Sequence, residues 1–279
     1  MVLCFYVFTL FPEARVLSLP ADEAEHLARV LRVKPGAAVR LFDGRGFECE
    51  AQVSAVTRHE VTVEIGSPVT PAAECRVRVT LAQAVLKGDK VDDVIRDAVM
   101  MGVAAVQPLL TARTDVPPAA FARSGRVERW RRIAIASAKQ CGRAVVPEIY
   151  PPASLPACLD ADRSDVRLLL VEPSAATLQA AASRLPQSVA SAIVLIGPEG
   201  GWAASEVSTA VTAGCRTITL GARTLRADAT PLVALSVLQY FWGDIPRVGG
   251  EGRGTRDSGF GVRDSGLATR DSGLAIRAE

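Results

Sequence analysis

The 279-residue chain has few of the side chains that hold metal ions and no large excess of charge of either sign. It contains only two histidines, His26 and His59, and its six cysteines include no C-x-x-C pair, so no structural metal site is expected. The 32 basic and 30 acidic residues leave a formal net charge of +2. Bulk positive charge is therefore absent, and any surface that binds nucleic acid must be local.

Long hydrophobic runs are also missing. No segment reaches the roughly 20 consecutive apolar residues that a membrane helix needs. The apolar start, residues 1–11, lacks a basic region and a small-residue cleavage site, and Pro12 follows it, so we interpret it as a first strand. Scattered cysteines without a signal peptide predict a reduced, cytoplasmic protein with buried thiols.

The first part of the chain alternates between apolar and polar residues, as short strands do. Strands are predicted at residues 39–42, 47–53 and 61–65, with a turn at 43–46 and a helix between Glu23 and Arg32. Pro68 and Pro71 then predict a linker. We therefore expect a small β domain over residues 1–73.

From about Cys75 onward, strands and helices alternate. The predicted strands are 77–86, 103–110, 166–171, 192–196 and 217–220, and the predicted helices between them include 88–101 and 204–211. This alternation is typical of a mostly parallel sheet that is covered on both faces. A second domain is expected over residues 74–246.

The last predicted helix begins at Thr230-Pro231, where a threonine can cap free backbone N–H groups and a proline suits the first turn. Its body, residues 232–242, is apolar nearly all the way round, so it needs burial on more than one side. Packing inside one subunit and packing at a subunit interface would each provide that burial.

Beyond Pro246 the sequence Arg-Asp-Ser-Gly recurs every seven residues. A coiled coil is not expected, because the fixed positions are polar and a glycine in each repeat costs a helix about 1 kcal/mol. The composition instead predicts a disordered tail over residues 247–279.

A glycine-rich loop, residues 197–201, directly follows the predicted strand 192–196. Glycines let the backbone approach a ligand, and open α/β sheets bind ligands at the carboxyl ends of their strands. The spacing fits neither G-x-G-x-x-G nor a phosphate-binding loop, which disfavours dinucleotides and nucleotides. From these residues alone, a small-ligand site and a simple turn are both open.

Several ordered motifs together resemble one family. The resemblance is to the ribosomal RNA small subunit methyltransferase E family, whose members are uridine-N3 methyltransferases of the SPOUT class. It is carried by the loop Ile196 to Gly201, the later segment Leu220 to Asp228 and the long apolar helix. Residues 26–32, 34–36 and 41–44 resemble that family's PUA-like RNA-binding domain, and residues 87–90, 102–103 and 140–143 resemble its middle. The similarity runs from about residue 5 to Asp244.

The resemblance implies an α/β trefoil-knotted SPOUT methyltransferase domain preceded by a small PUA-like β-barrel domain. In such a knot, three loops meet around S-adenosyl-L-methionine. Family members are typically homodimers, and no metal is expected as a cofactor or partner of this chain. By position, the implied cofactor-binding residues are Leu170, Glu172, Ile196, Gly197, Pro198, Gly200, Gly201, Leu220, Gly221 and Leu225.

The implied reaction is methylation of N3 of one uridine of 16S ribosomal RNA, the family's target being uridine 1498, as a step in rRNA processing and ribosome biogenesis. The proton on N3 of the uracil must first be removed, and Arg226 would stabilise the resulting uracil anion. Asp228 is the candidate proton acceptor and Glu199 the second candidate, although an aspartate with a pKa of about 3.9 would need desolvation. Alternatively, Asp228 only orients Arg226, or Arg226 forms a structural pair with Asp228 or Glu199.

Local basic residues are expected to contact the RNA substrate, either free 16S ribosomal RNA or the small ribosomal subunit. The alternative interpretation is that these basic residues only form a solvated helix face. To reach the pocket, the target base of the RNA would have to be unpaired or flipped out. The candidates from the two domains are His26, Arg29, Arg32, Lys34, Arg129, Arg132, Lys139 and Arg143.

Three positions depart from the family's pattern. Relatives commonly carry Leu-Arg-x-Glu-Thr where this chain has residues 225–229 with Asp228 and Ala229, and they often carry a serine helix cap at the position of Ala203. Two other functions stay open: a non-catalytic RNA-binding ribosome assembly factor, and a SPOUT methyltransferase for another RNA site. The intact Gly-Pro-Glu-Gly-Gly sequence argues against the first.

Overall fold

The computed structural model describes residues 3–10, 15–57, 60–115, 121, 123–172 and 188–245. They belong to one compact unit, Met1–Ile245. The tail predicted over residues 247–279 lies outside the described residues. Across the described ranges, the helices are all too short or too polar to span a membrane.

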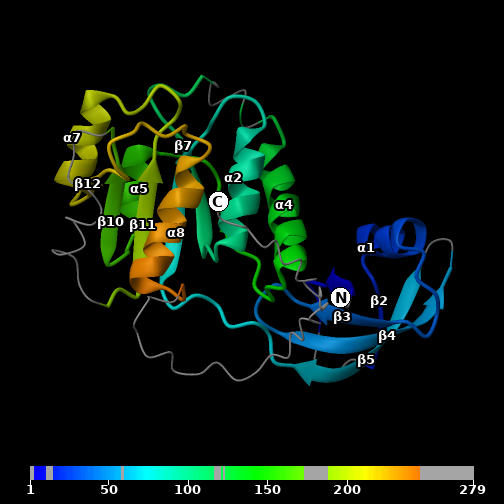
Figure 1. Ribbon diagram of the computed structural model, residues 1–279. Helices are drawn as coiled ribbons and strands as arrows, with labels where there is room; N and C mark the ends of the chain where they lie inside the picture. The colour runs from blue at the N-terminus through cyan, green and yellow to red at the C-terminus, as the bar shows by residue number, and fades with distance from the viewer. Residues whose placement is uncertain are drawn as a thin grey trace, which may run out of the picture. The chain divides into compact units, whose positions relative to one another are not determined.

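The N-terminal part of the chain folds into a five-stranded sheet (Figure 1). Alternate side chains of its strands, such as Leu41, Val53 and Val63, form one buried core, as the sequence pattern predicts. Strand β1 is parallel to β3, and the remaining pairs are antiparallel. In spatial order the strands are β1 (Leu3–Tyr6), β3 (Ala38–Phe42), β4 (Glu48–Val56), β5 (Val61–Val69) and β2 (Val16–Ser18).

The helix expected between Glu23 and Arg32 consists of two short pieces, α1 (Ala21–Glu25) and the π-helical turn η1 (His26–Val30). Ala24 and Leu27 are its residues in the core of the five-stranded sheet. The basic side chains His26 and Arg29 lie on the exposed side.

The interpretation of Pro68 as part of a linker is wrong, because β5 continues to Val69. Pro68 lies opposite Cys49, next to a shift in the register between Cys49 and Ala51. Prolines occur in sheets at such irregularities because the missing N–H removes no regular ladder hydrogen bond there.

The second part of the chain builds a seven-stranded sheet in which every pair is parallel, as predicted. The spatial order is β12-β10-β11-β6-β7-β8, and β9 pairs with β7. The trefoil knot stays a prediction, since strand order does not define how a chain is threaded. The strands are β6 (Arg78–Ala84), β7 (Ala105–Leu110), β8 (Glu148–Ile149), β9 (Ala153–Ser154), β10 (Val166–Leu170), β11 (Ser191–Ile196) and β12 (Arg216–Ile218).

Helices cover both faces of this sheet (Figure 1). Helices α2 (Lys90–Met100), α4 (Arg126–Cys141) and α8 (Thr230–Trp242) pack on one face, and α5 (Leu155–Ala161) and α7 (Ala204–Thr212) pack on the other. Strand β11 supplies both cores because its side chains alternate. Val194 joins the core under α2, whereas Ile193 and Leu195 join the core under α5 and α7.

Helix α8 begins at Thr230 as predicted, but the threonine does not cap it. The N-cap residue is Ala229, and the Thr230 hydroxyl donates a 2.7 Å hydrogen bond to the carbonyl oxygen of Arg226. This bond instead fixes the loop that precedes the helix.

The two sides of α8 differ in burial. Ala234, Leu235 and Leu238 are at most 1% exposed, because they pack on α2 and the sheet. On the outer side Leu232 and Tyr240 are 40% and 42% exposed in the single chain. The outer face of α8, which also includes Val233, is thus an exposed apolar surface in the single chain.

Candidate active site

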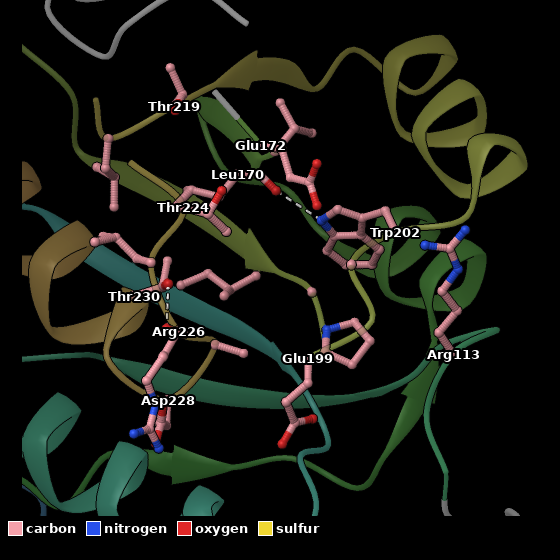
Figure 2. A pocket seen from close by; sticks show the side chains of 18 of the residues that line it. Arg113, Leu170, Glu172, Glu199, Trp202, Thr219, Thr224, Arg226, Asp228 and Thr230 are labelled. Atoms are coloured by element: carbon pink, nitrogen blue, oxygen red, sulfur yellow. Dashed lines mark hydrogen bonds and ion pairs between the residues drawn. The ribbon is translucent and has the colours of Figure 1, made fainter. Parts of the chain in front are cut away.

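A pocket of about 810 Å³ lies at the carboxyl ends of β10, β11 and β12 (Figure 2). Three loops form its walls: one follows β10, one follows β11, and one connects β12 to α8. Pockets for small ligands typically have volumes of about 300–1,000 Å³ and lie at this end of parallel strands. The place and the size both suit a small organic ligand.

The glycine loop needs glycine at two places for different reasons. Gly201 has a φ angle of +69°, a left-handed conformation, and its N–H closes a turn by donating to the Pro198 carbonyl at 2.9 Å. At Gly197 an added Cβ would lie only 3.2 Å from the indole ring of Trp202. A larger residue at either place would strain the loop or press on Trp202, so the loop conformation favours glycine there.

Trp202 links two walls of the pocket (Figure 2). Its indole N–H donates to the carbonyl oxygen of Leu170 at 2.9 Å, while its ring lies against Gly197. The loop after β10 and the loop after β11 are joined by this one side chain.

Arg226 and Asp228 face each other across a short turn on the third wall. The guanidinium donates to both carboxylate oxygens, from Nε at 3.1 Å and from Nη2 at 2.7 Å. The Arg226 side chain is 76% exposed and the Asp228 side chain 23%. The hydrogen bond from Arg226 holds the pKa of Asp228 below its usual value.

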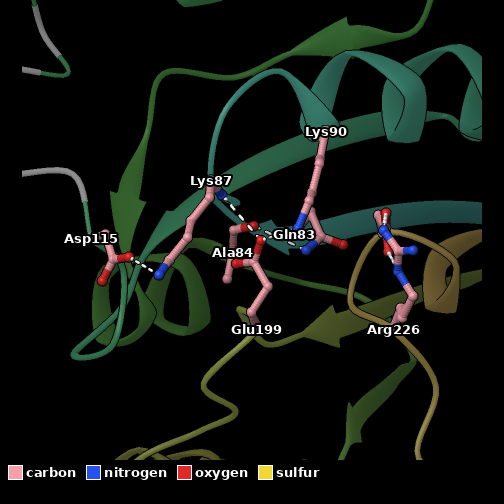
Figure 3. A network of polar contacts seen from close by, with 8 residues as sticks. Gln83, Ala84, Lys87, Lys90, Asp115, Glu199 and Arg226 are labelled. Carbon is pink, nitrogen blue, oxygen red and sulfur yellow. Dashed lines mark hydrogen bonds and ion pairs between the residues drawn. The ribbon is translucent and has the colours of Figure 1, made fainter.

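Glu199 forms a second charged pair at the same pocket (Figure 3). Its Oε1 accepts from the ammonium of Lys90 at 2.8 Å and from the backbone N–H of Lys87 at 3.3 Å. Burial acts to raise the pKa of Glu199, but the bond from Lys90 and the backbone N–H groups outweigh burial and lower it. The Lys87 side chain turns away and pairs with Asp115 at 2.6 Å.

Two family models match the chain. One, described as an RNA methyltransferase domain, matches residues 73–239, and the other, an RNA methyltransferase PUA domain, matches residues 19–66. The chain belongs to the RNA methyltransferase family. The predicted fold, a PUA-like domain before an α/β methyltransferase domain of the SPOUT class, is thereby confirmed.

Individual relatives agree with this family. The ribosomal RNA small subunit methyltransferase E of Synechocystis sp. is 32% identical over 222 residues, which cover 79% of this chain and 71% of the relative. The crystal structure of the Neisseria gonorrhoeae enzyme of that name, bound to S-adenosyl methionine, is 31% identical with a TM-score of 0.81, covering 88% of this chain and all (100%) of the other. A Legionella pneumophila methyltransferase structure with bound SAM is 28% identical, with a TM-score of 0.82 and the same coverage of 88% and 100%.

The structure brings most of the predicted site residues of this methyltransferase together. The three predicted catalytic residues, Arg226, Asp228 and Glu199, all line the pocket. Gly200 lines an adjoining pocket of about 480 Å³ instead, and Gly221 shapes its turn with a φ angle of +130°. The predicted cofactor residues that do line the main pocket are Leu170, Glu172, Ile196, Gly197, Pro198, Gly201, Leu220 and Leu225.

Sequence reasoning missed several pocket residues, and three of them have polar contacts at the site: Lys90, Arg113 and Trp202. Arg113, from the segment after β7, donates to the carbonyl oxygen of Gly200 at 2.6 Å. Nothing around Arg113 in the sequence signals this contact. An aromatic residue directly after the glycines, and a lysine inside a motif shared with the family, were signals for the other two.

The serine helix cap of the relatives is absent at Ala203, and Glu206 provides hydrogen bonds at this helix start instead. Ala203 is the N-cap residue of α7 and has no side-chain acceptor. Glu206 accepts from the backbone N–H of Ala203 at 2.9 Å, and its other oxygen accepts from Ala112 at 2.8 Å. One carboxylate thus ties the start of α7 to the segment after β7.

The predicted RNA-binding residues fall into two groups. One group is exposed: His26, Arg29, Arg32, Lys34, Arg129 and Arg132. The other is engaged within the chain. Lys139 pairs with Glu23 at 2.6 Å, and the mostly buried Arg143 binds Glu74 and the carbonyl oxygens of Val99 and Val103. In the exposed group, Arg129 pairs with Asp89 and Asp92, and Arg29 with Glu25.

Proposed function

We propose that this chain methylates N3 of a uridine in 16S ribosomal RNA and uses S-adenosyl-L-methionine as the methyl donor. One observation carries the proposal: the glycine loop and the Arg226 turn, 20 or more residues apart in the sequence, line the same pocket. Membership in the RNA methyltransferase family supports it, as does the likeness to the Neisseria gonorrhoeae enzyme bound to S-adenosyl methionine.

The pocket suits adenosylmethionine in size and in chemistry. Leu170, Ile196 and Leu220 offer apolar walls for the adenine ring, and Glu172 offers a carboxylate for hydroxyl groups or an ammonium group. When bound, this cofactor supplies an electrophilic methyl group on a positively charged sulfur. Backbone groups at the strand ends are the remaining candidates for holding it.

Arg226 is proposed to stabilise negative charge on the uracil. Its guanidinium lines the pocket and keeps exposed N–H groups that can donate to a uracil oxygen. Asp228 is held by two hydrogen bonds from Arg226 and its pKa is lowered, so the desolvation that a general base needs is not met. Of the two roles considered for Asp228, these contacts favour orienting Arg226.

The RNA substrate is proposed to lie along the exposed basic residues of both parts of the chain. Residues 1–73 would form the RNA-binding domain and residues 74–246 the catalytic domain of a cytoplasmic enzyme. Arg32 and Lys34 in the PUA-like part leave their charges open to solvent, as Arg132 does on α4, and the His26 side chain is also exposed. Lys139 and Arg143 contribute less to RNA binding, because each already pairs with a carboxylate within the chain.

A homodimer is proposed to form through the outer face of α8. This face exposes Leu232, Val233 and Tyr240, and apolar patches of this kind mark contact surfaces. We expect Val233→Asp to convert the dimer to a monomer in light scattering, because a dimer interface would bury the new charge without a partner. Val211→Asp on α7 is the matched control, since Val211 is 51% exposed and lies on another helix. A wild-type monomer would contradict the proposal.

The experiment that tests the function is mass spectrometry of 16S ribosomal RNA from a strain that lacks this protein. The N3-methyluridine should disappear, and the wild-type chain should restore it, whereas Arg226→Ala should not. Unchanged N3-methyluridine would refute the assigned atom and RNA. Calorimetry on the purified chain then separates a non-catalytic assembly factor, which would not bind adenosylmethionine, from a methyltransferase that acts on another site.

A further inference from the structure

Lys90 occupies an unfavourable place for a cation. It is the first residue of α2, where the helix dipole and the free N–H groups create partial positive charge. Acidic residues usually occupy this turn, as Asp92 and Asp93 do here. A residue that breaks a local rule without a local gain is more often explained by a functional site than by stability.

The Lys90 side chain is directed into the pocket by Glu199. Its ammonium lies 2.8 Å from Glu199 Oε1, and its side chain is 38% exposed and lines the main pocket. Lys87, three residues earlier, pairs with Asp115 and does not line that pocket. Of these two neighbouring lysines, Lys90 is therefore the one that a bound base would meet.

Lys90 and Arg226 lie on the same side of Glu199, each with its own carboxylate (Figure 3). Glu199 holds Lys90, and Asp228 holds Arg226. The other charged residues that line the pocket are Arg113, which donates to the Gly200 carbonyl, together with Glu172 and Arg223. Two cations from separate elements, α2 and the loop before α8, thus line the same pocket.

We propose that Lys90, positioned by Glu199, acts with Arg226 to stabilise the anion of the target uracil. This inference rests on the proposed function. The N3–H bond breaks, the proton passes to hydroxide from solvent to give water, and the electron pair stays on the ring, where it spreads over N3 and the two carbonyl oxygens. Lys90 and Arg226 donate to those oxygens, and the carboxylates of Glu199 and Asp228 are positioning residues rather than bases.

The test compares Lys90→Gln and Lys90→Arg with the control Arg96→Gln. Arg96 is on the same helix, is exposed, pairs with Asp93 and does not line the pocket. We expect Lys90→Gln to lower kcat on 16S RNA substrate about 10- to 100-fold, below the effect of a fully buried donor because Lys90 is partly exposed. Lys90→Arg keeps the cation and should stay within several-fold of wild type. Adenosylmethionine affinity, measured by calorimetry, should stay unchanged in all three.

The pH dependence gives a readout that a structural role would not change. A tenfold weaker stabilisation of the anion moves the midpoint of the rise in kcat with pH upward by about one unit. Glu199→Gln should cost less than tenfold, whereas loss of a general base costs about 100-fold or more. An unshifted midpoint in Lys90→Gln, or a 100-fold loss in Glu199→Gln, would overturn the inference.

Failure of the inference can be told apart from failure of the proposed function. If wild type and Arg96→Gln form N3-methyluridine but Lys90→Gln is equally active, only the role of Lys90 is refuted. If both lysine variants lose adenosylmethionine binding, Lys90 supports the loop and the inference is also refuted. If wild type forms no N3-methyluridine, the proposed function itself fails.

Discussion

Two walls of the pocket differ in burial and in charge. The loop after β11 is packed: Pro198 is buried, and Gly197 and Trp202 are half-buried against each other. The loop before α8 is open: Arg223 and Thr224 are exposed, and the Arg226 side chain is 76% exposed. Apart from Glu199, which pairs with Lys90, shape defines the first wall, and charge defines the second.

The difference suggests a division of labour between the walls. A packed wall of glycines and an indole suits a ligand of constant shape, which here is the proposed cofactor. An open, charged wall suits a base that must enter from a large RNA and leave again. Substitutions on the two walls should therefore separate catalysis from cofactor binding.

Arg226→Ala on the open wall should give the largest effect. We expect kcat to fall about 100-fold or more, because a charged donor to the uracil anion is lost. The affinity for adenosylmethionine should change little, since the packed wall is untouched. Steady-state kinetics on 16S RNA, with calorimetry on the same sample, checks both values. A loss of affinity as large as the loss of kcat would erase the distinction between the walls.

Gly201→Ala on the packed wall should give an intermediate effect, and it should weaken cofactor binding rather than lower kcat. Alanine at a φ angle of +69° costs about 1–2 kcal/mol, which lowers Tm by about 2–8 °C. Gly214→Ala is the matched control, because Gly214 also has a positive φ, +86°, and an added Cβ there meets nothing within 4 Å.

Both glycine variants should lose similar stability in thermal unfolding. Only Gly201→Ala should also weaken adenosylmethionine binding, because Gly201 lines the pocket and Gly214 does not. Equal affinity in the two variants would contradict the proposed role of the glycine loop.

The sequence predicts the parts of this site that depend on neighbours along the chain. The strand 192–196 follows from its apolar run, and the pair of Arg226 with Asp228, two residues apart, is one of the alternatives that the sequence analysis gives. The fold class can also be predicted from the sequence, because alternating strands and helices are typical of a parallel sheet.

Contacts between distant segments could not be predicted in this way. Lys90 and Glu199 are 109 residues apart, and Arg113 and Gly200 are 87 apart. No local periodicity encodes either contact, because the sheet order β11-β6-β7 brings the segments together. The Thr230 cap failed for a local reason instead: Thr230 is the first residue of α8 and Ala229 is the N-cap, and the Thr230 hydroxyl donates to the Arg226 carbonyl four residues earlier.

Trp202→Phe should give the smallest effect and probes the link between two walls. Phenylalanine keeps an aromatic ring beside Gly197 but removes the N–H that donates to Leu170 at 2.9 Å. One hydrogen bond contributes about 0.5–1.5 kcal/mol, so Tm should fall by only a few degrees, roughly 1–6 °C. Adenosylmethionine affinity should fall several-fold while kcat at saturating cofactor stays near wild type. Because the indole joins the loops after β10 and β11, a change in kcat alone would instead place Trp202 with the charged wall.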